Sequence, residues 1–161
     1  MRRVFIVLLI LITAIQFLRP ERSNIPEDPA KNIQSYVKVP DEITKILIRS
    51  CYDCHSNTTR WPWYSEIAPF SWVIADDVKL GRRHLNFSEW GTYSQKRMGK
   101  KLYQIAEVAG DSSMPLTSYR LTHPDAKLSS MELKMLGTWA EEKADEIPDS
   151  DDDYEEGTSH K

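Results

Sequence analysis

Hydrophobic and polar positions divide the chain into an apolar start, several amphipathic segments and a polar end. The start places Arg2 and Arg3 before an apolar run from Val4 to Leu18. Basic residues ahead of such a run are typical of an export signal or an N-terminal membrane anchor. No pair of small residues for a signal peptidase follows, so we interpret residues 1–19 as an uncleaved transmembrane anchor. The leading arginines would stay in the cytoplasm, which places the rest of the chain on the periplasmic side of a bacterial inner membrane.

Four later segments repeat apolar residues at helical spacing and are predicted to be helices. They cover residues 41–50, about 70–83, about 95–109 and about 129–142. The residues at their core-facing positions are Ile43, Ile46, Leu47, Trp72, Val73, Val78, Met98, Leu102, Ile105, Val108, Leu136, Trp139 and Ala140. No alternating strand pattern of any length occurs, so the sequence predicts an all-α fold.

Capping residues mark the expected helix ends. Asp41 follows Pro40 and is predicted to cap the first of these helices. Ser129 and Glu132 have the spacing of a capping box at the start of the last one. Gly110 stands where the third helix is expected to stop, because glycine accepts the left-handed conformation of a C-terminal cap.

The segments between the helices are rich in proline and polar residues. Residues 20–40 contain four prolines and are predicted to be an extended linker. Residues 111–127 are rich in proline, serine and threonine and are predicted to be a loop. The folded domain is therefore expected at residues 41–144.

Charge is unevenly distributed along the chain. Residues 141–161 carry ten acidic and two basic side chains, so the total of −3 leaves +5 for residues 1–140. The acidic end has few apolar residues, which predicts a disordered, solvated tail at residues 145–161. The basic excess of the body is too small and too dispersed to suggest nucleic-acid binding.

The two cysteines of the chain lie in the stretch SCYDCHSNTTRW, and a histidine directly follows the second. In a C-x-x-C-H motif, two thiols three positions apart can reach the two vinyl groups of haem from one helical turn. The imidazole that follows is then placed to bind the iron. We therefore predict that Cys51 and Cys54 attach one haem c covalently and that His55 is the proximal ligand of its iron.

Three other uses of the cysteine pair fit the sequence less well. A structural zinc site needs four ligands, and the second pair would have to come from His84 and His123, which are 39 residues apart. A thioredoxin-like redox pair sits at a helix N-terminus in a strand–helix setting, whereas this pair follows a predicted helix. A disulfide across so short a spacing would close a small loop and stabilise little.

The second axial ligand decides what a bound haem can do. Met114 is the first candidate, because it lies in the predicted loop, 59 residues after His55, and precedes Pro115. A thioether in that place would leave no open coordination position, whereas packing in the core is its alternative use. His84 and His123 are rival ligands and would give a bis-histidine iron. The remaining methionines on predicted helices are assigned to the core, and they are Met98, Met131 and Met135.

Aromatic and arginine side chains are concentrated after the C-x-x-C-H motif. Trp61 and Trp63 are predicted to contact the porphyrin, because large flat side chains pack against its face and can donate an N–H to a propionate. Core packing explains them equally well. Three arginines could pair with propionates or form a docking surface, although a solvated surface is their usual role, and they are Arg60, Arg82 and Arg83.

Together these residues resemble the bacterial haem-binding domain family that is related to cytochrome c. The resemblance rests on SCYDCHSNTTRWPWYSEIAPFSWVIADDVKLGRRHLNFSEW and SMPLTSYRLTHPDAKLSSMELKMLGTWA and covers roughly residues 41–142. It implies a cytochrome c-like helical domain around a covalent haem, with residues 43–49 crossing residues 133–140. It also implies that Met114 is the distal ligand. The long insert between the cysteine motif and Met114 departs from mono-haem cytochromes c.

The sequence as a whole predicts a membrane-anchored, periplasmic mono-haem c-type cytochrome. Such a protein would pass single electrons to redox partner proteins, as a carrier rather than an enzyme. The alternative is a haem-based sensor of small ligands, or a weak peroxidase, in which Met114 leaves the sixth coordination position open. A zinc or interaction module without haem is a third hypothesis.

Overall fold

Helices and short turns make up the part of the chain that the computed structural model describes, residues 1–148, and no β-strand occurs in that part. This confirms the all-α prediction. The α-helices are α1 (Arg2–Ile15), α2 (Asp41–Ser50), α3 (Tyr52–His55), α4 (Phe70–His84), α5 (Gln95–Asp111), α6 (Thr117–Thr122) and α7 (Ser130–Asp145). Short 3₁₀ helices cover Pro29–Lys31 (η1), Ile33–Ser35 (η2), Trp63–Glu66 (η3), Phe87–Thr92 (η4) and Pro124–Ala126 (η5).

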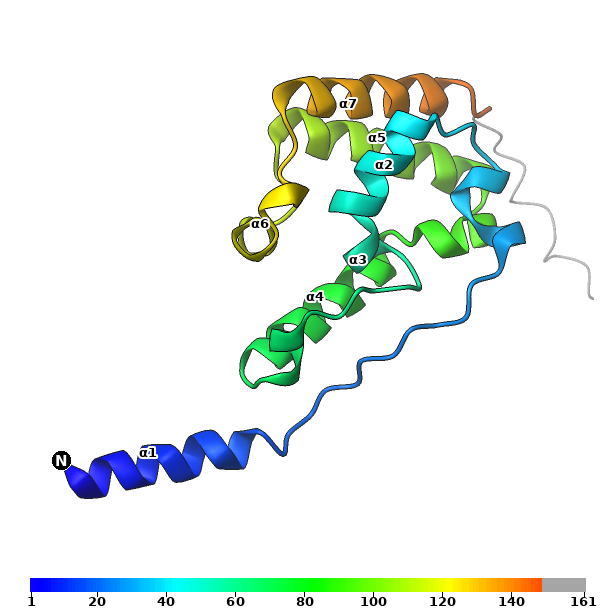
Figure 1. Cartoon of the computed structure of the whole chain (residues 1–161). Coiled ribbons are helices and arrows are strands. Elements are labelled where there is room, and N and C mark those ends of the chain that lie inside the picture. Colours follow the sequence, from blue (N-terminus) through cyan, green and yellow to red (C-terminus); the bar gives the residue numbers. More distant parts are fainter. Residues whose placement is uncertain (149–161) are drawn as a thin grey trace, which may run out of the picture.

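The hydrophobic core lies where α2 crosses the pair formed by α5 and α7 (Figure 1). The predicted core residues that are buried are Ile43, Ile46, Leu47, Val78, Met98, Leu102, Ile105, Leu136, Trp139 and Ala140. Val73 is exposed instead, and Trp72 and Val108 are half-buried. Burial of each large apolar side chain contributes about 1.5–3 kcal/mol, so this crossing supplies much of the stability of the domain.

One ion pair and one capping box fix the start of α7 against α2. The Ser129 side chain accepts from the backbone N–H of Glu132, and the Glu132 carboxylate accepts from the backbone N–H of Ser129, which confirms the predicted capping box. Glu132 also pairs with Arg49 of α2 at 2.5 Å. Hydrogen bonds from Ser129 and from Arg49 lower the pKa of Glu132 to about 2, so this carboxylate is ionised at neutral pH.

Two of the other helix ends differ from the prediction. Pro40 occupies the N-cap position of α2, and Asp41 is the first helical residue. There its carboxylate interacts favourably with the positive end of the helix dipole rather than capping a backbone N–H. Gly110 lies inside α5, and Ser112 ends that helix in the left-handed conformation with φ 57°. The helix therefore extends past the glycine.

Residues 20–40 were predicted to be an extended linker, but part of this segment belongs to the fold. It forms η1 and η2, and Ile33 (0% exposed) and Val37 are buried in the core. The N–H of Ile25 donates to the carbonyl of Asn57 at 3.0 Å. The prolines correctly indicated irregular backbone. Ile33 and Val37 are only two apolar residues, which is too short a pattern to predict burial.

Residues 111–127 were predicted to be a loop, but α6 and η5 lie within them. Ala126 of η5 and Leu128 just beyond it are buried, whereas α6 contains no buried residue. Proline and serine-rich composition does not distinguish a loop from single helical turns.

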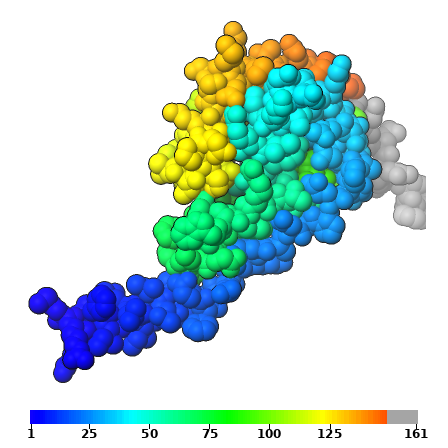
Figure 2. Space-filling model, in the orientation of Figure 1, coloured from blue at the N-terminus to red at the C-terminus, as the bar shows by residue number. Residues whose placement is uncertain are grey.

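The N-terminal helix α1 extends away from the body of the molecule (Figure 2), and none of its residues is buried. It has 14 residues. Across residues 1–148, every helix is too short or too polar to span a membrane. The transmembrane helix predicted within residues 1–19 is therefore not found. The side chain of Gln16, just after α1, both accepts from the N–H of Ala68 and donates to its carbonyl, at 2.9 and 3.1 Å.

The predicted acidic tail, residues 145–161, lies mostly outside the described residues. Its first residue, Asp145, ends α7, and Ile147 packs against the core. The described end of the tail is thus part of the folded domain.

Candidate functional site

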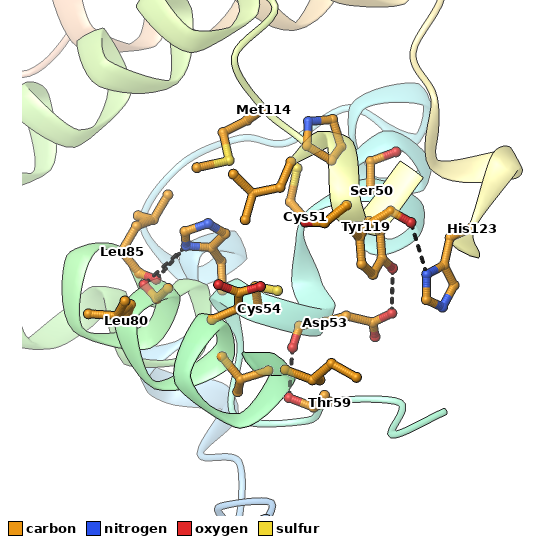
Figure 3. Close-up of a pocket in the computed structure, with 18 of the residues that line it drawn as sticks. Ser50, Cys51, Asp53, Cys54, Thr59, Leu80, Leu85, Met114, Tyr119 and His123 are labelled. Atoms are coloured by element: carbon orange, nitrogen blue, oxygen red, sulfur yellow. Dashed lines mark hydrogen bonds between the residues drawn. The ribbon is translucent and has the colours of Figure 1, made fainter. Parts of the chain in front are cut away.

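A cavity of about 1100 Å³ opens between α3, α4, α5 and the segment around α6. This volume lies just above the range of about 300–1,000 Å³ for small-molecule and cofactor sites. Apolar side chains form much of its wall, and they include Leu47, Val78, Leu85, Phe87, Ile105 and Leu136. Cys51, Cys54, His55 and Met114, the residues predicted to hold haem, all line the same cavity. Figure 3 labels three of them, Cys51, Cys54 and Met114.

The two thiols lie three positions apart on one turn, between the end of α2 and α3. Cys51 is the C-cap of α2 and the N-cap of α3, and Cys54 lies within α3. Neither forms a disulfide. Burial raises the pKa of each thiol to about 12, with a smaller contribution from Cys54 at Cys51 and from Asp77 at Cys54. Both are therefore protonated at neutral pH, unlike the low-pKa thiols of redox-active cysteine pairs.

His55 is held by two backbone carbonyls at the end of α4. Its Nδ1 lies 3.1 Å from the carbonyl oxygen of Gly81 and 3.0 Å from that of Leu85. Carbonyl oxygens only accept hydrogen bonds, so Nδ1 carries the proton and Nε2 has a free lone pair. Burial lowers the pKa of His55, partly offset by these two hydrogen bonds. The neutral tautomer with a free Nε2 is the form that binds a metal.

The close approach of α4 to the cysteine turn depends on Gly81. A Cβ atom added at this position would overlap the carbonyl oxygen of Cys54 and stand 3.1 Å from the Cys54 Cβ. The backbone of α4 therefore packs directly on α3, which brings the carbonyl of Gly81 within reach of the His55 ring. The role of Gly81 cannot be predicted from the sequence, because the residues around a glycine inside a helix do not show what packs against it.

All three residues considered as a second axial ligand line the cavity, namely Met114, His84 and His123. Met114 is 37% exposed. The Nδ1 atom of His123 lies 3.2 Å from the hydroxyl of Thr122. Met98 is buried in the core as predicted, whereas Met131 and Met135 are exposed on α7 and were wrongly assigned to the core.

The aromatic residues after the motif divide between the cavity and other roles. Trp63, Tyr64 and Phe70 line the cavity. Trp61, which was predicted to contact the porphyrin, does not line the cavity, and its indole N–H donates to the Oδ1 atom of Asn24 at 3.2 Å. The indole N–H of Trp72 donates to the carbonyl of Leu18 at 2.6 Å. The polar end of these two tryptophans therefore fastens the N-terminal segment to the domain.

The three arginines considered for propionate pairing have different surroundings in the structure. Arg82 donates to the backbone carbonyls of Ser56 and Asn57 at 2.8 and 3.1 Å, which holds the chain after the motif. Arg83 is exposed and does not line the cavity. Arg60 lines the cavity but pairs with a carboxylate of the protein itself.

That carboxylate belongs to Asp53, which the sequence analysis missed. It lies between the two cysteines and is 6% exposed. Arg60 donates to it from Nε at 3.0 Å, from Nη2 at 3.1 Å and from its backbone N–H at 3.1 Å. The hydroxyl of Tyr119 in α6 donates to the Oδ2 atom at 2.7 Å. Burial and this hydrogen bond raise the pKa of Tyr119.

The zinc alternative lacks a set of ligands. Within residues 1–148, no group of three or more histidine, cysteine, aspartate or glutamate side chains is arranged to hold a metal ion. His84 and His123 line the wall of the cavity without joining the cysteine pair in such a group. The cavity instead combines two thiols, one oriented imidazole and an apolar wall, a donor set and a volume that suit a haem.

Comparison with known proteins gives one match. The model of a family described as a haem-binding domain matches residues 10–142. No curated protein and no solved structure matches the chain. The matched range contains every residue named above as lining the cavity. It also includes residues 20–40, in agreement with their partial burial in the fold.

Replacement of Gly81 by alanine is expected to destabilise the protein, because the new Cβ would overlap the backbone of Cys54. Overpacking of this kind costs about 1–3 kcal/mol, and we expect a loss of that size in the free energy of unfolding of Gly81→Ala. Gly110→Ala is the matched control, since a Cβ there meets nothing within 4 Å. The free energy of unfolding of Gly110→Ala should rise by about 0.5–1 kcal/mol, because alanine reduces the conformational entropy of the unfolded chain. Urea unfolding followed by circular dichroism measures both, and equal stability of the two variants would contradict the tight packing at Gly81.

Proposed function

This chain belongs to the haem-binding domain family, and from that premise we propose that it holds one haem c covalently and carries single electrons. The observation that carries the proposal is the convergence of Cys51, Cys54 and an oriented His55 on one cavity. Iron in a bound haem supplies the one-electron chemistry. The protein supplies attachment, ligands and an apolar wall.

The two cysteines would attach the cofactor by simple addition. Each thiol adds its sulfur and its hydrogen across one vinyl double bond, so the reaction needs neither an oxidant nor a reductant. The raised pKa of Cys51 and Cys54 keeps both hydrogens on sulfur at neutral pH. Their position on one turn between α2 and α3 directs both sulfurs into the cavity (Figure 3).

The axial ligands would be His55 and Met114. His55 offers Nε2 because the carbonyls of Gly81 and Leu85 fix the proton on Nδ1. Met114 offers a thioether from the segment before α6. A histidine–methionine pair gives a higher potential than two histidines, which would suit delivery of electrons to a redox partner such as a terminal oxidase or peroxidase.

One observation favours a second candidate function. Met114 is 37% exposed, and α6, which follows it, contains no buried residue. A thioether held this loosely could leave the sixth coordination position open or exchangeable. The protein would then act as a sensor of small ligands or a weak peroxidase.

We also propose that α1 directs the domain to the periplasmic side of a bacterial inner membrane. An apolar helix of 10–14 residues is typical of a core helix, an interfacial segment or the apolar part of a signal peptide. None of the residues of α1 is buried, so a core helix does not apply. Arg2 and Arg3 before the apolar run agree with an export segment.

Covalent attachment is expected to depend on both thiols. Protein produced with the haem-attachment machinery should keep its pigment after denaturation and extraction with acidic organic solvent. The double variant Cys51→Ser, Cys54→Ser should lose it, while Tyr52→Phe on the same turn should keep it. Absorbance of the denatured polypeptide measures the result, and colourless wild-type protein would disprove covalent attachment.

Replacement of Met114 separates the two candidate functions. In an electron carrier, Met114→Ala should lower the reduction potential and raise the rate of carbon monoxide binding to the reduced protein by at least about tenfold, because the sixth position opens. Met135→Ala is the control, since Met135 is similarly exposed at 39% but lies outside the cavity. Unchanged potential and carbon monoxide binding in Met114→Ala would instead favour the sensor or peroxidase.

Export is expected to require the apolar run. The double variant Leu9→Arg, Leu11→Arg should remain in the cytoplasm and carry no covalent haem, because charged residues are costly in an inserted apolar segment. Met131→Arg, which places one arginine on the exposed surface of α7, is the control. Cell fractionation with measurement of haem content tests this, and normal haem loading of the double variant would exclude the role of α1 in export.

A further inference from the structure

The segment that carries Met114 is attached to the domain by few apolar contacts. Its helix α6 contains no buried residue, and Leu121 at its end is 77% exposed. Leu116 ahead of the helix is also exposed. Pro115, next to Met114, is buried, but α6 beyond it gains little from burial, so we expect its polar contacts to determine where it lies relative to the cavity.

The strongest of these contacts joins α6 to the cysteine turn itself. The Tyr119 hydroxyl donates to the Oδ2 atom of Asp53 at 2.7 Å, and Asp53 is buried between Cys51 and Cys54 (Figure 3). Hydrogen bonds to an ionised acceptor are short and about twice as strong as neutral ones. The Asp53 carboxylate therefore links α6 to the turn that would hold the haem.

Asp53 does not need Tyr119 to offset its charge. The guanidinium of Arg60 pairs with both carboxylate oxygens at 3.0 and 3.1 Å, and the backbone N–H of Arg60 adds a third hydrogen bond. Arg60 lies just after the motif, so these contacts offset the buried charge of Asp53 without help from α6. What the Tyr119 hydroxyl adds is the connection to α6.

A second contact supports the same placement. The ring of Tyr119 stacks on that of His123 with centroids 4.2 Å apart and an interplanar angle of 18°. The hydroxyl of Tyr64 lies 3.5 Å from Nδ1 of His123, at the limit of a hydrogen bond. The Asp53–Tyr119 hydrogen bond is thus the shorter attachment of the two.

We propose that the Asp53–Tyr119 hydrogen bond is a clasp that holds the Met114 segment over the cavity and thereby keeps Met114 available as the sixth ligand. Tyr119 is a positioning residue, because it acts on the iron site through the segment that carries Met114. The ligation part of this inference rests on the proposed function, whereas the attachment of α6 does not.

The first experiment measures the clasp without haem. Tyr119→Phe removes only the hydroxyl, and hydrogen exchange is followed in the full chain produced without the attachment machinery. Amides between residues 113 and 122 should exchange roughly tenfold to a hundredfold faster, as expected for loss of a hydrogen bond to a charged group, while α5 and α7 stay protected. Tyr103→Phe is the control, since the Tyr103 hydroxyl donates to Asp145 on α7. Unchanged exchange in Tyr119→Phe overturns the clasp.

The second experiment measures ligation in the haem-loaded protein. Tyr119→Phe should weaken the sulfur-to-iron charge-transfer band and raise the rate of carbon monoxide binding by about tenfold or more, with covalent haem content unchanged. Faster exchange with an unchanged band and rate would show a purely structural contact and overturn the role in ligation. Wild-type protein without covalent haem would disprove the proposed function and, with it, the ligation role, while the exchange result would still decide the clasp.

Discussion

Two backbone carbonyls at the end of α4 fix the orientation of the imidazole on which the cavity depends. The carbonyl of Gly81 accepts from the N–H of Leu85 and from Nδ1 of His55, so both of its lone pairs are used. The carbonyl of Leu85, just past the helix, accepts from the same ring nitrogen. A carbonyl past a helix end, such as that of Leu85, has no helical partner, and together with the second lone pair of the Gly81 carbonyl it selects one tautomer of His55. The contact requires that α4 lie directly on the cysteine turn, which the missing side chain at position 81 allows.

The cavity wall controls charge as well as shape. Desolvation keeps Cys51 and Cys54 in the thiol form and His55 in the neutral form, so these three side chains carry no charge. Asp53 is the exception, and it is buried with an arginine fork and a tyrosine hydroxyl around it. A buried carboxylate without such partners would cost several kcal/mol. The polar network around Asp53 is therefore what permits a charge on this otherwise apolar turn.

The sequence predicted the parts of the structure that local patterns encode. Helical spacing located α2, α4, α5 and α7, and the motif located the two thiols and His55. Contacts between distant segments left no such pattern. The role of Gly81 depends on what packs against it, and Asp53 is known as a network residue only once α6 is placed. Trp61 was assigned to the cavity by proximity in sequence, yet its indole turns to Asn24. Single turns such as α6 were hidden by proline and serine, whose local preferences compete with helix formation.

The burial of Ile33 and Val37, which precede α2 in the chain, determines where the chain can be shortened. These two side chains belong to the core, and Tyr36 between them lies so close to Gly91 that a Cβ at that glycine would overlap its hydroxyl. A truncated protein that begins at Asp41 would uncover η4 and lose two buried aliphatic residues, each worth about 1.5–3 kcal/mol. Against a typical total stability of about 5–15 kcal/mol, that loss is large. A shortened version of the protein that lacks α1 should therefore keep the proline-rich stretch at residues 20–40, although this stretch looks dispensable in the sequence.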